Sequence, residues 1–123
     1  MATVLVVDSH PEVVLLLRTV LGQSHDLVVA SNGDEAFAMV AANRPSLILL
    51  DVRMPGLDGF RVLLRLKSDP GTARLPVIML TALDEDHDLM LGLSLGADSY
   101  VTKPINPREL AILVARQLEV SAV

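Results

Sequence analysis

The sequence predicts an α/β fold: a doubly wound, five-stranded parallel sheet with five helices on its two faces. Three observations support this prediction. Short runs rich in Val, Ile and Leu recur four times along the 123 residues, and a brief fifth strand-like segment, Ser-Tyr-Val-Thr, lies at 99–102; the apolar runs are typical of strands buried on both faces. A segment of helical length follows each run. Turn residues separate these segments, so right-handed crossovers would place helices on both faces of the sheet.

The first four predicted strands are short apolar runs that end at a polar or turn residue. Aliphatic and β-branched side chains fill the runs, which favours extended, buried strands. The clearest run spans residues 46–50 and stops at Asp51, after which a Met-Pro-Gly turn begins at Met54. Strands are expected at residues 3–7, 27–30, 47–50, 77–80 and 99–102.

The predicted helices carry apolar residues at helical spacing together with signals for their ends. Gly22 is a typical C-terminal residue, and the three acids at 84–86 suit the positive N-terminal end of a helix dipole. Asn106, Pro107 and Glu109 match an N-cap, an N1 proline and an N3 glutamate. Helices are expected at residues 11–21, 34–43, 58–67, 83–95 and 107–120.

Composition and charge exclude several classes of function. Residues 1–123 are expected to form one domain, and cysteine is absent, which removes disulfides and thiolate metal sites. Fifteen acidic against ten basic residues give a net charge of −5 with no basic cluster, so direct nucleic-acid binding is not expected. No apolar run approaches the ~20 residues of a membrane-spanning helix. The first three residues lack the basic start of a signal peptide, and we expect a cytoplasmic protein.

Polar side chains follow four of the predicted strands. Asp8 and Ser9 follow the first strand, Asp51 the third and Thr81 the fourth, and Lys103 follows the fifth. The carboxyl ends of parallel strands meet at one edge of a sheet, where open α/β sheets bind ligands. Two carboxylates there suit Mg²⁺, which prefers oxygen ligands. A hydroxyl and an ammonium could hold a phosphoryl group once Asp51 has attacked as nucleophile.

In order and spacing, these motifs resemble the receiver domain of two-component response regulators over nearly the whole chain. The resemblance implies a flavodoxin-like fold with strand order 2-1-3-4-5, as in chemotaxis-regulator-like domains. The matching motifs are Val6-Val7-Asp8, Leu49-Leu50-Asp51-Val52-Arg53-Met54-Pro55-Gly56-Leu57-Asp58-Gly59, Pro76-Val77-Ile78-Met79-Leu80-Thr81-Ala82, Gly96-Ala97-Asp98-Ser99-Tyr100 and Lys103-Pro104.

The resemblance implies a role for each of the matching polar residues. Asp51 would be the phosphoacceptor, charged by a histidine kinase, a phosphotransfer protein or a small acyl phosphate. Asp8, Asp51 and the main-chain carbonyl of Arg53 would ligate Mg²⁺. Thr81 and Lys103 would contact the phosphoryl group. Such a domain accepts a phosphoryl group and is not an enzyme beyond slow self-dephosphorylation.

The resemblance also implies a switch and an output surface. Thr81 and Tyr100 would change position on activation, and the Lys103–Pro104 peptide bond would be cis. The face made by segments 83–95, 99–102 and 107–120 would bind an effector or form a homodimer. From the residues alone, Thr81 could instead cap the next helix, Lys103 could be a solvated charge and Tyr100 could only fill the core.

Ser9 departs from the family pattern, which usually has a second acid here as a direct metal ligand. Its hydroxyl is a doubtful ligand, so Mg²⁺ affinity should fall. Ser9 and Glu12 could instead form a capping box for the first helix. The alternative function is a phosphorylation-independent pseudo-receiver that acts only as a protein-interaction module. The neighbouring His10 is given no role, because a lone exposed histidine is usually inert.

Two further interpretations concern Arg53 and the apolar surface. A phosphatase with an Asp nucleophile normally carries a second acid two residues later, and Arg53 occupies that place, so we disfavour this function. Residues 13–17 are apolar around the whole helix, and segments 89–95 and 110–115 carry more apolar residues than a core face needs. Exposed apolar patches usually mark partner surfaces, so these helices favour self-association or a protein partner.

Overall fold

The computed structural model describes residues 2–54, 56–81 and 94–121, and it confirms the parallel α/β sheet. The strand order is β2-β1-β3-β4-β5, as expected for a flavodoxin-like fold. The strands are β1 (Thr3–Val7), β2 (Asp26–Ala30), β3 (Leu47–Asp51), β4 (Val77–Thr81) and β5 (Ser99–Thr102). The helices are α1 (Pro11–Leu21), α2 (Gly33–Asn43), α3 (Gly59–Ser68) and α5 (Pro107–Ser121). The helix expected at 83–95 falls almost entirely outside the described residues.

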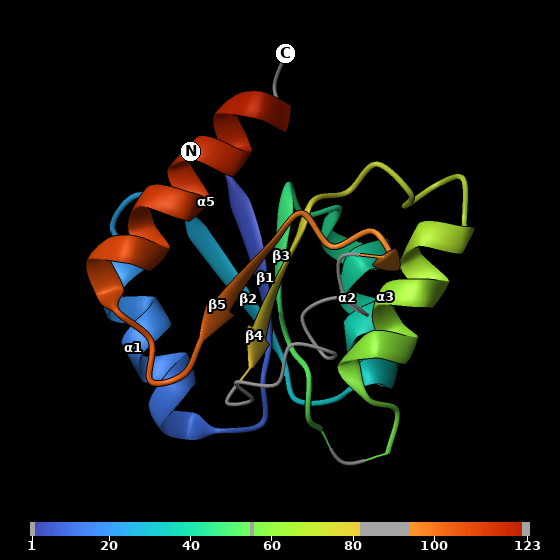
Figure 1. The fold of residues 1–123 in the computed structure, drawn as a ribbon, viewed down its shortest axis with the longest axis horizontal. Coiled ribbons are helices and arrows are strands. Elements are labelled where there is room, and N and C mark those ends of the chain that lie inside the picture. Colours follow the sequence, from blue (N-terminus) through green and yellow to red (C-terminus); the bar gives the residue numbers. More distant parts are fainter. Residues whose placement is uncertain (1, 55, 82–93, 122–123) are drawn as a thin grey trace.

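Helices cover both faces of the sheet, with α1 and α5 on one face and α2 and α3 on the other (Figure 1). Side chains alternate along each strand, so one strand feeds two separate cores. In β1, Val4 and Val6 belong to the core beneath α1 and α5, whereas Leu5 and Val7 belong to the core beneath α2 and α3. Every residue of β3 is buried, which explains why its sequence is a continuous apolar run. Among the described helices, none is long and apolar enough to span a membrane.

The sheet register brings the ends of β1 and β3 together. The two strands are parallel neighbours, and Val7 pairs with Leu50. Asp8 and Asp51 therefore come next on adjacent strands, about 4.8 Å apart in backbone spacing. Side-chain alternation also places both on the face of the sheet that α1 and α5 cover.

Side-chain caps begin α3 and α5; the sequence predicts the one at Asn106, whereas it places Asp58 inside the helix. The side chain of Asp58 accepts a hydrogen bond from the Arg61 N–H at the start of α3, and Asn106 accepts one from the Glu109 N–H before α5. The predicted capping box at Ser9 is wrong. His10 is the N-cap residue of α1, and its side chain makes no capping hydrogen bond.

Most of the apolar surface of α1 is used inside the fold. Leu17 is fully buried, and Leu15 stays 67% exposed. Three more apolar side chains of α1, Val13, Val14 and Leu16, lie half-buried against the core shared with α5. Among the described residues, the other large exposed apolar side chains are Leu64 on α3 and Ile112 on α5. These two helices lie on opposite faces of the sheet (Figure 1).

Lys67 ties the end of α3 to the amino ends of β4 and β5. Its Nζ donates to the carbonyls of Leu75 at 2.8 Å and Ala73 at 3.3 Å. It also lies 3.7 Å from Asp98 Oδ2. The same carboxylate oxygen accepts a 2.8 Å hydrogen bond from the Val77 N–H, at the first residue of β4. One ammonium and one carboxylate thus join three elements.

Candidate functional site

Two buried carboxylates lie side by side at the carboxyl edge of the sheet. Asp8 follows β1 and is 1% exposed, and Asp51 ends β3 and is 3% exposed. Their neighbouring positions follow from the β1–β3 register. Burying two like charges together is costly unless cations or hydrogen-bond donors compensate them. The groups around the pair therefore determine its chemistry.

Lys103 supplies one compensating charge. Its Nζ lies 3.0 Å from Asp8 Oδ2 and 3.4 Å from Asp51 Oδ1. The residue comes directly after β5, and its backbone N–H donates to the Thr81 carbonyl at 2.6 Å, which holds the segment beside the end of β4. The Lys103–Pro104 peptide bond is cis, as expected.

His10 is a second group at the carboxylates, although sequence analysis gave it no role. Its Nδ1 lies 2.8 Å from Asp8 Oδ1 and 3.6 Å from Asp51 Oδ2. Its backbone N–H also donates to Asp8 Oδ1 at 2.8 Å, which forms an Asx turn. Pro11 restricts the preceding residue to extended backbone, and His10 adopts φ −95°, ψ 112°. The Asp-x-His-Pro spacing was the signal that could have placed this ring in the site.

The surroundings of Asp51 make its charged form costly, and a bound cation would offset that cost. Burial raises the pKa of Asp51, and the negative charge of Asp8 raises it further. Lys103 and the Arg53 N–H, which lies 3.3 Å from Oδ1, lower the pKa but do not cancel these effects. Among the described residues, Asp51 Oδ2 is a buried side-chain oxygen with no hydrogen-bond partner. An unpaired buried carboxylate oxygen beside a second carboxylate fits the oxygen-ligand set of a divalent cation.

The other predicted site residues lie around this pair at different depths. Thr81 is buried at the carboxyl end of β4, the strand next to β3. Tyr100 on β5 is half-buried and packs against the core beneath α2 and α3. The side chain of Arg53 is exposed. Ser9 is half-buried and lines a neighbouring hollow with Pro11 and other residues of α1 and β2.

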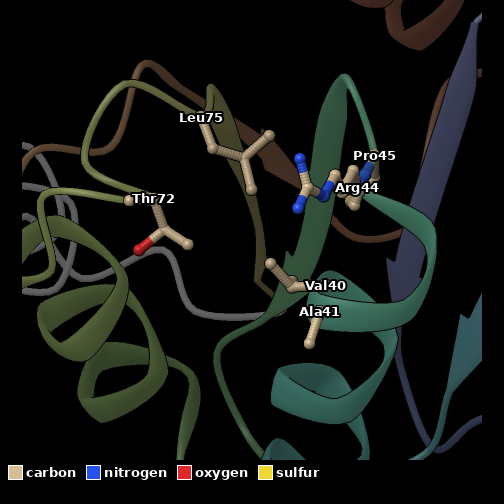
Figure 2. Close-up of a pocket in the computed structure, with 7 residues that line it drawn as sticks. Val40, Ala41, Arg44, Pro45, Thr72 and Leu75 are labelled. Atoms are coloured by element: carbon tan, nitrogen blue, oxygen red, sulfur yellow. The ribbon is translucent and has the colours of Figure 1, made fainter.

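A small hollow opens beside the carboxylates, and a larger one lies elsewhere. The small hollow has a volume of about 240 Å³, and the residues that line it are His10, Glu12, Val13, Asp51, Val52, Arg53 and Lys103. The larger hollow, of about 510 Å³, lies between α2 and the loop after α3 (Figure 2). Arg44 is the charged side chain among its lining residues. Grouped titratable side chains, rather than size, therefore identify the candidate site.

Gly59 brings the start of α3 against the backbone of Asp51. A Cβ at this position would lie 2.2 Å from the Asp51 carbonyl oxygen, so only glycine fits. The Gly59 N–H donates to the Val52 carbonyl at 2.9 Å. The start of α3 therefore lies directly against the main chain of Asp51 and Val52, which explains the glycine in the predicted motif.

Comparison with known proteins identifies the family. The model of the response regulator receiver domain matches residues 4–115. The chain belongs to this family. This receiver domain is 45% identical over 108 residues to the alkaline phosphatase synthesis transcriptional regulatory protein PhoP of Bacillus subtilis (strain 168). The match covers 87% of this chain and 44% of PhoP.

Solved receiver structures agree with the fold. A response regulator from Chloroflexus aurantiacus J-10-fl superposes with a TM-score of 0.91 at 34% identity, covering 96% of this chain and 98% of that one. The Mn²⁺-bound form of response regulator Rcp1 superposes with a TM-score of 0.81 at 31% identity, covering 93% and 89%. The receiver domain spans about half, or less, of the length of the curated relatives it matches. Its family is one of signalling domains and places it in two-component signalling.

Proposed function

We propose that this receiver domain accepts a phosphoryl group on Asp51 and thereby switches a protein-binding face. The observation that carries the proposal is the Oδ2 atom of Asp51, which is buried, has no hydrogen-bond partner among the described residues and lies beside a hollow. A carboxylate oxygen without a hydrogen-bond partner retains its lone pairs for attack on phosphorus. In this step the Asp51 oxygen forms a bond to phosphorus, and the donor's P–N bond (phosphohistidine) or P–O bond (acyl phosphate) breaks.

A divalent cation fits the same pocket and would neutralise charge on the phosphoryl oxygens. Asp8, Asp51 and the main-chain carbonyl of Arg53 would hold Mg²⁺, with Ser9 as a doubtful fourth ligand. Lys103 already contacts both carboxylates, so its ammonium can move to the new phosphoryl oxygens over a short distance. The Thr81 hydroxyl, at the end of the adjacent strand, would bind another phosphoryl oxygen.

The donor and the output follow from the family. A histidine kinase, a phosphotransfer protein or a small acyl phosphate would supply the phosphoryl group in the cytoplasm. Thr81 and Tyr100 would transmit the change to β5, α5 and the segment expected at 83–95, where an effector protein or a second copy binds. The exposed Ile112 on α5 supports an apolar contact at this face. Direct binding of nucleic acid or membrane by these residues is not part of the proposal.

The alternative is a pseudo-receiver whose interactions do not depend on phosphorylation. The observation that favours it is Ser9, which leaves the pocket with two carboxylates where the family usually has three. Beryllofluoride, a mimic of the phosphoryl group, separates the two functions. Chemical shifts of Thr81 and Tyr100 change on its addition if the switch operates, and they stay unchanged in a pseudo-receiver.

The direct test is labelling by acyl phosphate. We expect wild type to gain one phosphoryl group per chain, measured by intact mass, and Asp51→Asn to gain none. Asp34→Asn is a matched control, because it removes an exposed acid on α2 that lies outside the site. Absence of labelling in wild type with any divalent cation, or equal labelling of Asp51→Asn, contradicts the proposal.

A further inference from the structure

His10 and Lys103 contact different oxygens of the same two carboxylates. Lys103 Nζ lies near Oδ2 of Asp8 and Oδ1 of Asp51. His10 Nδ1 lies near the remaining pair, Oδ1 of Asp8 and Oδ2 of Asp51. One nitrogen and two carboxylate oxygens, which are not the oxygens that pair with Lys103, therefore lie close together. The three residues form a group whose potential ligand atoms lie within 4.8 Å of one another.

The spacing of these three atoms suits a single metal ion. With metal–ligand bonds of about 2.1 Å, neighbouring ligand atoms lie about 3.0 Å apart at right angles and about 3.4 Å apart at tetrahedral angles. The two distances from His10 Nδ1 are 2.8 Å, to Asp8, and 3.6 Å, to Asp51, and they bracket this range. The Asp51 atom is the buried oxygen that has no hydrogen-bond partner among the described residues.

The local sequence holds the imidazole at the carboxylates before any ligand binds. Asp8 accepts the backbone N–H of His10 in the Asx turn, so the two side chains leave a tight turn close together. Pro11 then starts α1 and fixes the extended backbone of His10. The ring needs no large movement to reach a metal, because its Nδ1 already lies within hydrogen-bond distance of one carboxylate.

We propose that His10 Nδ1 is a metal ligand in this pocket, and that the site prefers a nitrogen-binding transition dication such as Zn²⁺ or Ni²⁺ over Mg²⁺. The proposal rests on the phosphoacceptor function in one respect, since it assigns the cation used at the same pocket. Imidazole suits transition metals, whereas Mg²⁺ takes oxygen ligands. With Ser9 in place of an acid, the neutral ring, protonated on Nε2, supplies a protein ligand in addition to Asp8, Asp51 and the main-chain carbonyl of Arg53.

The test compares how much affinity each metal loses in a variant, rather than the affinities themselves. Ni²⁺ and Zn²⁺ stand high in the general order of metal affinities, so tight binding alone would not identify the ligand. Isothermal titration calorimetry on the whole chain would measure Mg²⁺, Ni²⁺ and Zn²⁺ binding to wild type and to His10→Asn. We expect His10→Asn to weaken Ni²⁺ and Zn²⁺ by at least about tenfold and Mg²⁺ by less than about twofold. Equal losses for all three metals, or no loss for Ni²⁺ and Zn²⁺, would overturn the proposal.

Two control variants separate ligation from general effects. Glu12→Gln removes a charge that lines the same hollow but lies outside the three-residue group, so it should weaken all three metals by similar, small factors. His25→Ala removes an imidazole near the amino ends of β1 and β2, where His25 contacts the Ala2 N–H. It should leave Ni²⁺ binding unchanged, and an effect as large as that of His10→Asn would contradict the proposal.

A spectroscopic measurement and the labelling assay complete the test. Cu²⁺ added to wild type should show nitrogen hyperfine coupling in its electron paramagnetic resonance spectrum, and His10→Asn should lose it. Coupling that persists in His10→Asn contradicts ligation by this ring. Failure of the metal proposal leaves acyl-phosphate labelling of Asp51 with Mg²⁺ intact. Failure of the phosphoacceptor function abolishes labelling but leaves the difference in Ni²⁺ affinity.

Discussion

Replacing Lys103 by Met, which keeps most of the side chain's volume, should lower the free energy of unfolding, because the two buried carboxylates lose their compensating positive charge. At an effective dielectric constant of about 20, charges 3.0 Å and 3.4 Å apart attract by about 5.5 and 4.9 kcal/mol. The two carboxylates, within 4.8 Å of each other, repel by about 3.5 kcal/mol or more on the same scale. Desolvation of the ammonium offsets much of the attraction, and breaking a buried ion pair typically costs about 3–5 kcal/mol.

Urea denaturation at pH 7 with a chelator would measure this loss in the free energy of unfolding. Adding Asp51→Asn to the Lys103→Met variant removes the repulsion and should restore about 3 kcal/mol. It also allows the comparison if the single variant does not fold. Arg108→Met, which removes the same charge from an exposed position, should change stability by less than about 0.5 kcal/mol. A loss below about 1 kcal/mol for Lys103→Met, or no recovery in the double variant, would refute the charge-balance argument.

Three more predictions concern stability. Asp51→Asn should stabilise the metal-free protein at neutral pH, because burial raises the pKa of Asp51 above its ordinary value of 3.8. The native state then binds the proton more tightly than the unfolded state, so wild-type stability falls as pH rises from about 3.8 through the raised pKa. Below that pH range the stability advantage of Asn should vanish. Thermal unfolding from pH 3 to 7 tests the direction of this change. Gly59→Ala should cost at least about 1–3 kcal/mol in urea denaturation, because its Cβ would overlap the Asp51 carbonyl oxygen, and a neutral result would contradict the close approach. Asn106→Ala should lose about 1 kcal/mol through the missing N-cap of α5, whereas Asn106→Asp should retain most of it.

The fold was predictable because its signals are local. Continuous apolar runs identify the strands of a parallel sheet, and a cap such as Asn106 acts within three residues of the helix start. Ser9 and Glu12 looked like a capping box by the same local rule. That prediction failed because the first helix begins one residue later than a Ser9 cap requires, at Pro11 with His10 as N-cap.

The site was predictable only in part, because some of its contacts depend on distant segments. The convergence of Asp8, Asp51 and Lys103 follows from parallel topology, which places strand ends at one edge. The position of His10 depends on a turn that aims its ring at carboxylates from two strands, and no periodicity reveals that. The need for glycine at position 59 depends on how closely the loop after β3 folds back onto the backbone of Asp51, which the motif alone does not show.

The contacts of Lys67 determine which ends of β4 and β5 can shift. Its ammonium, with Asp98, fastens the amino end of β4 to the start of β5 and to the end of α3. The opposite ends of the same strands carry Thr81 and Lys103, which would respond to a phosphoryl group on Asp51. We therefore expect any displacement of β4 and β5 to be smallest at their amino ends, where Lys67 holds them, and largest at their carboxyl ends, beside Asp51. Removing the Lys67 contacts should change how far β4 and β5 move on phosphorylation, without altering the residues that would bind the phosphoryl group.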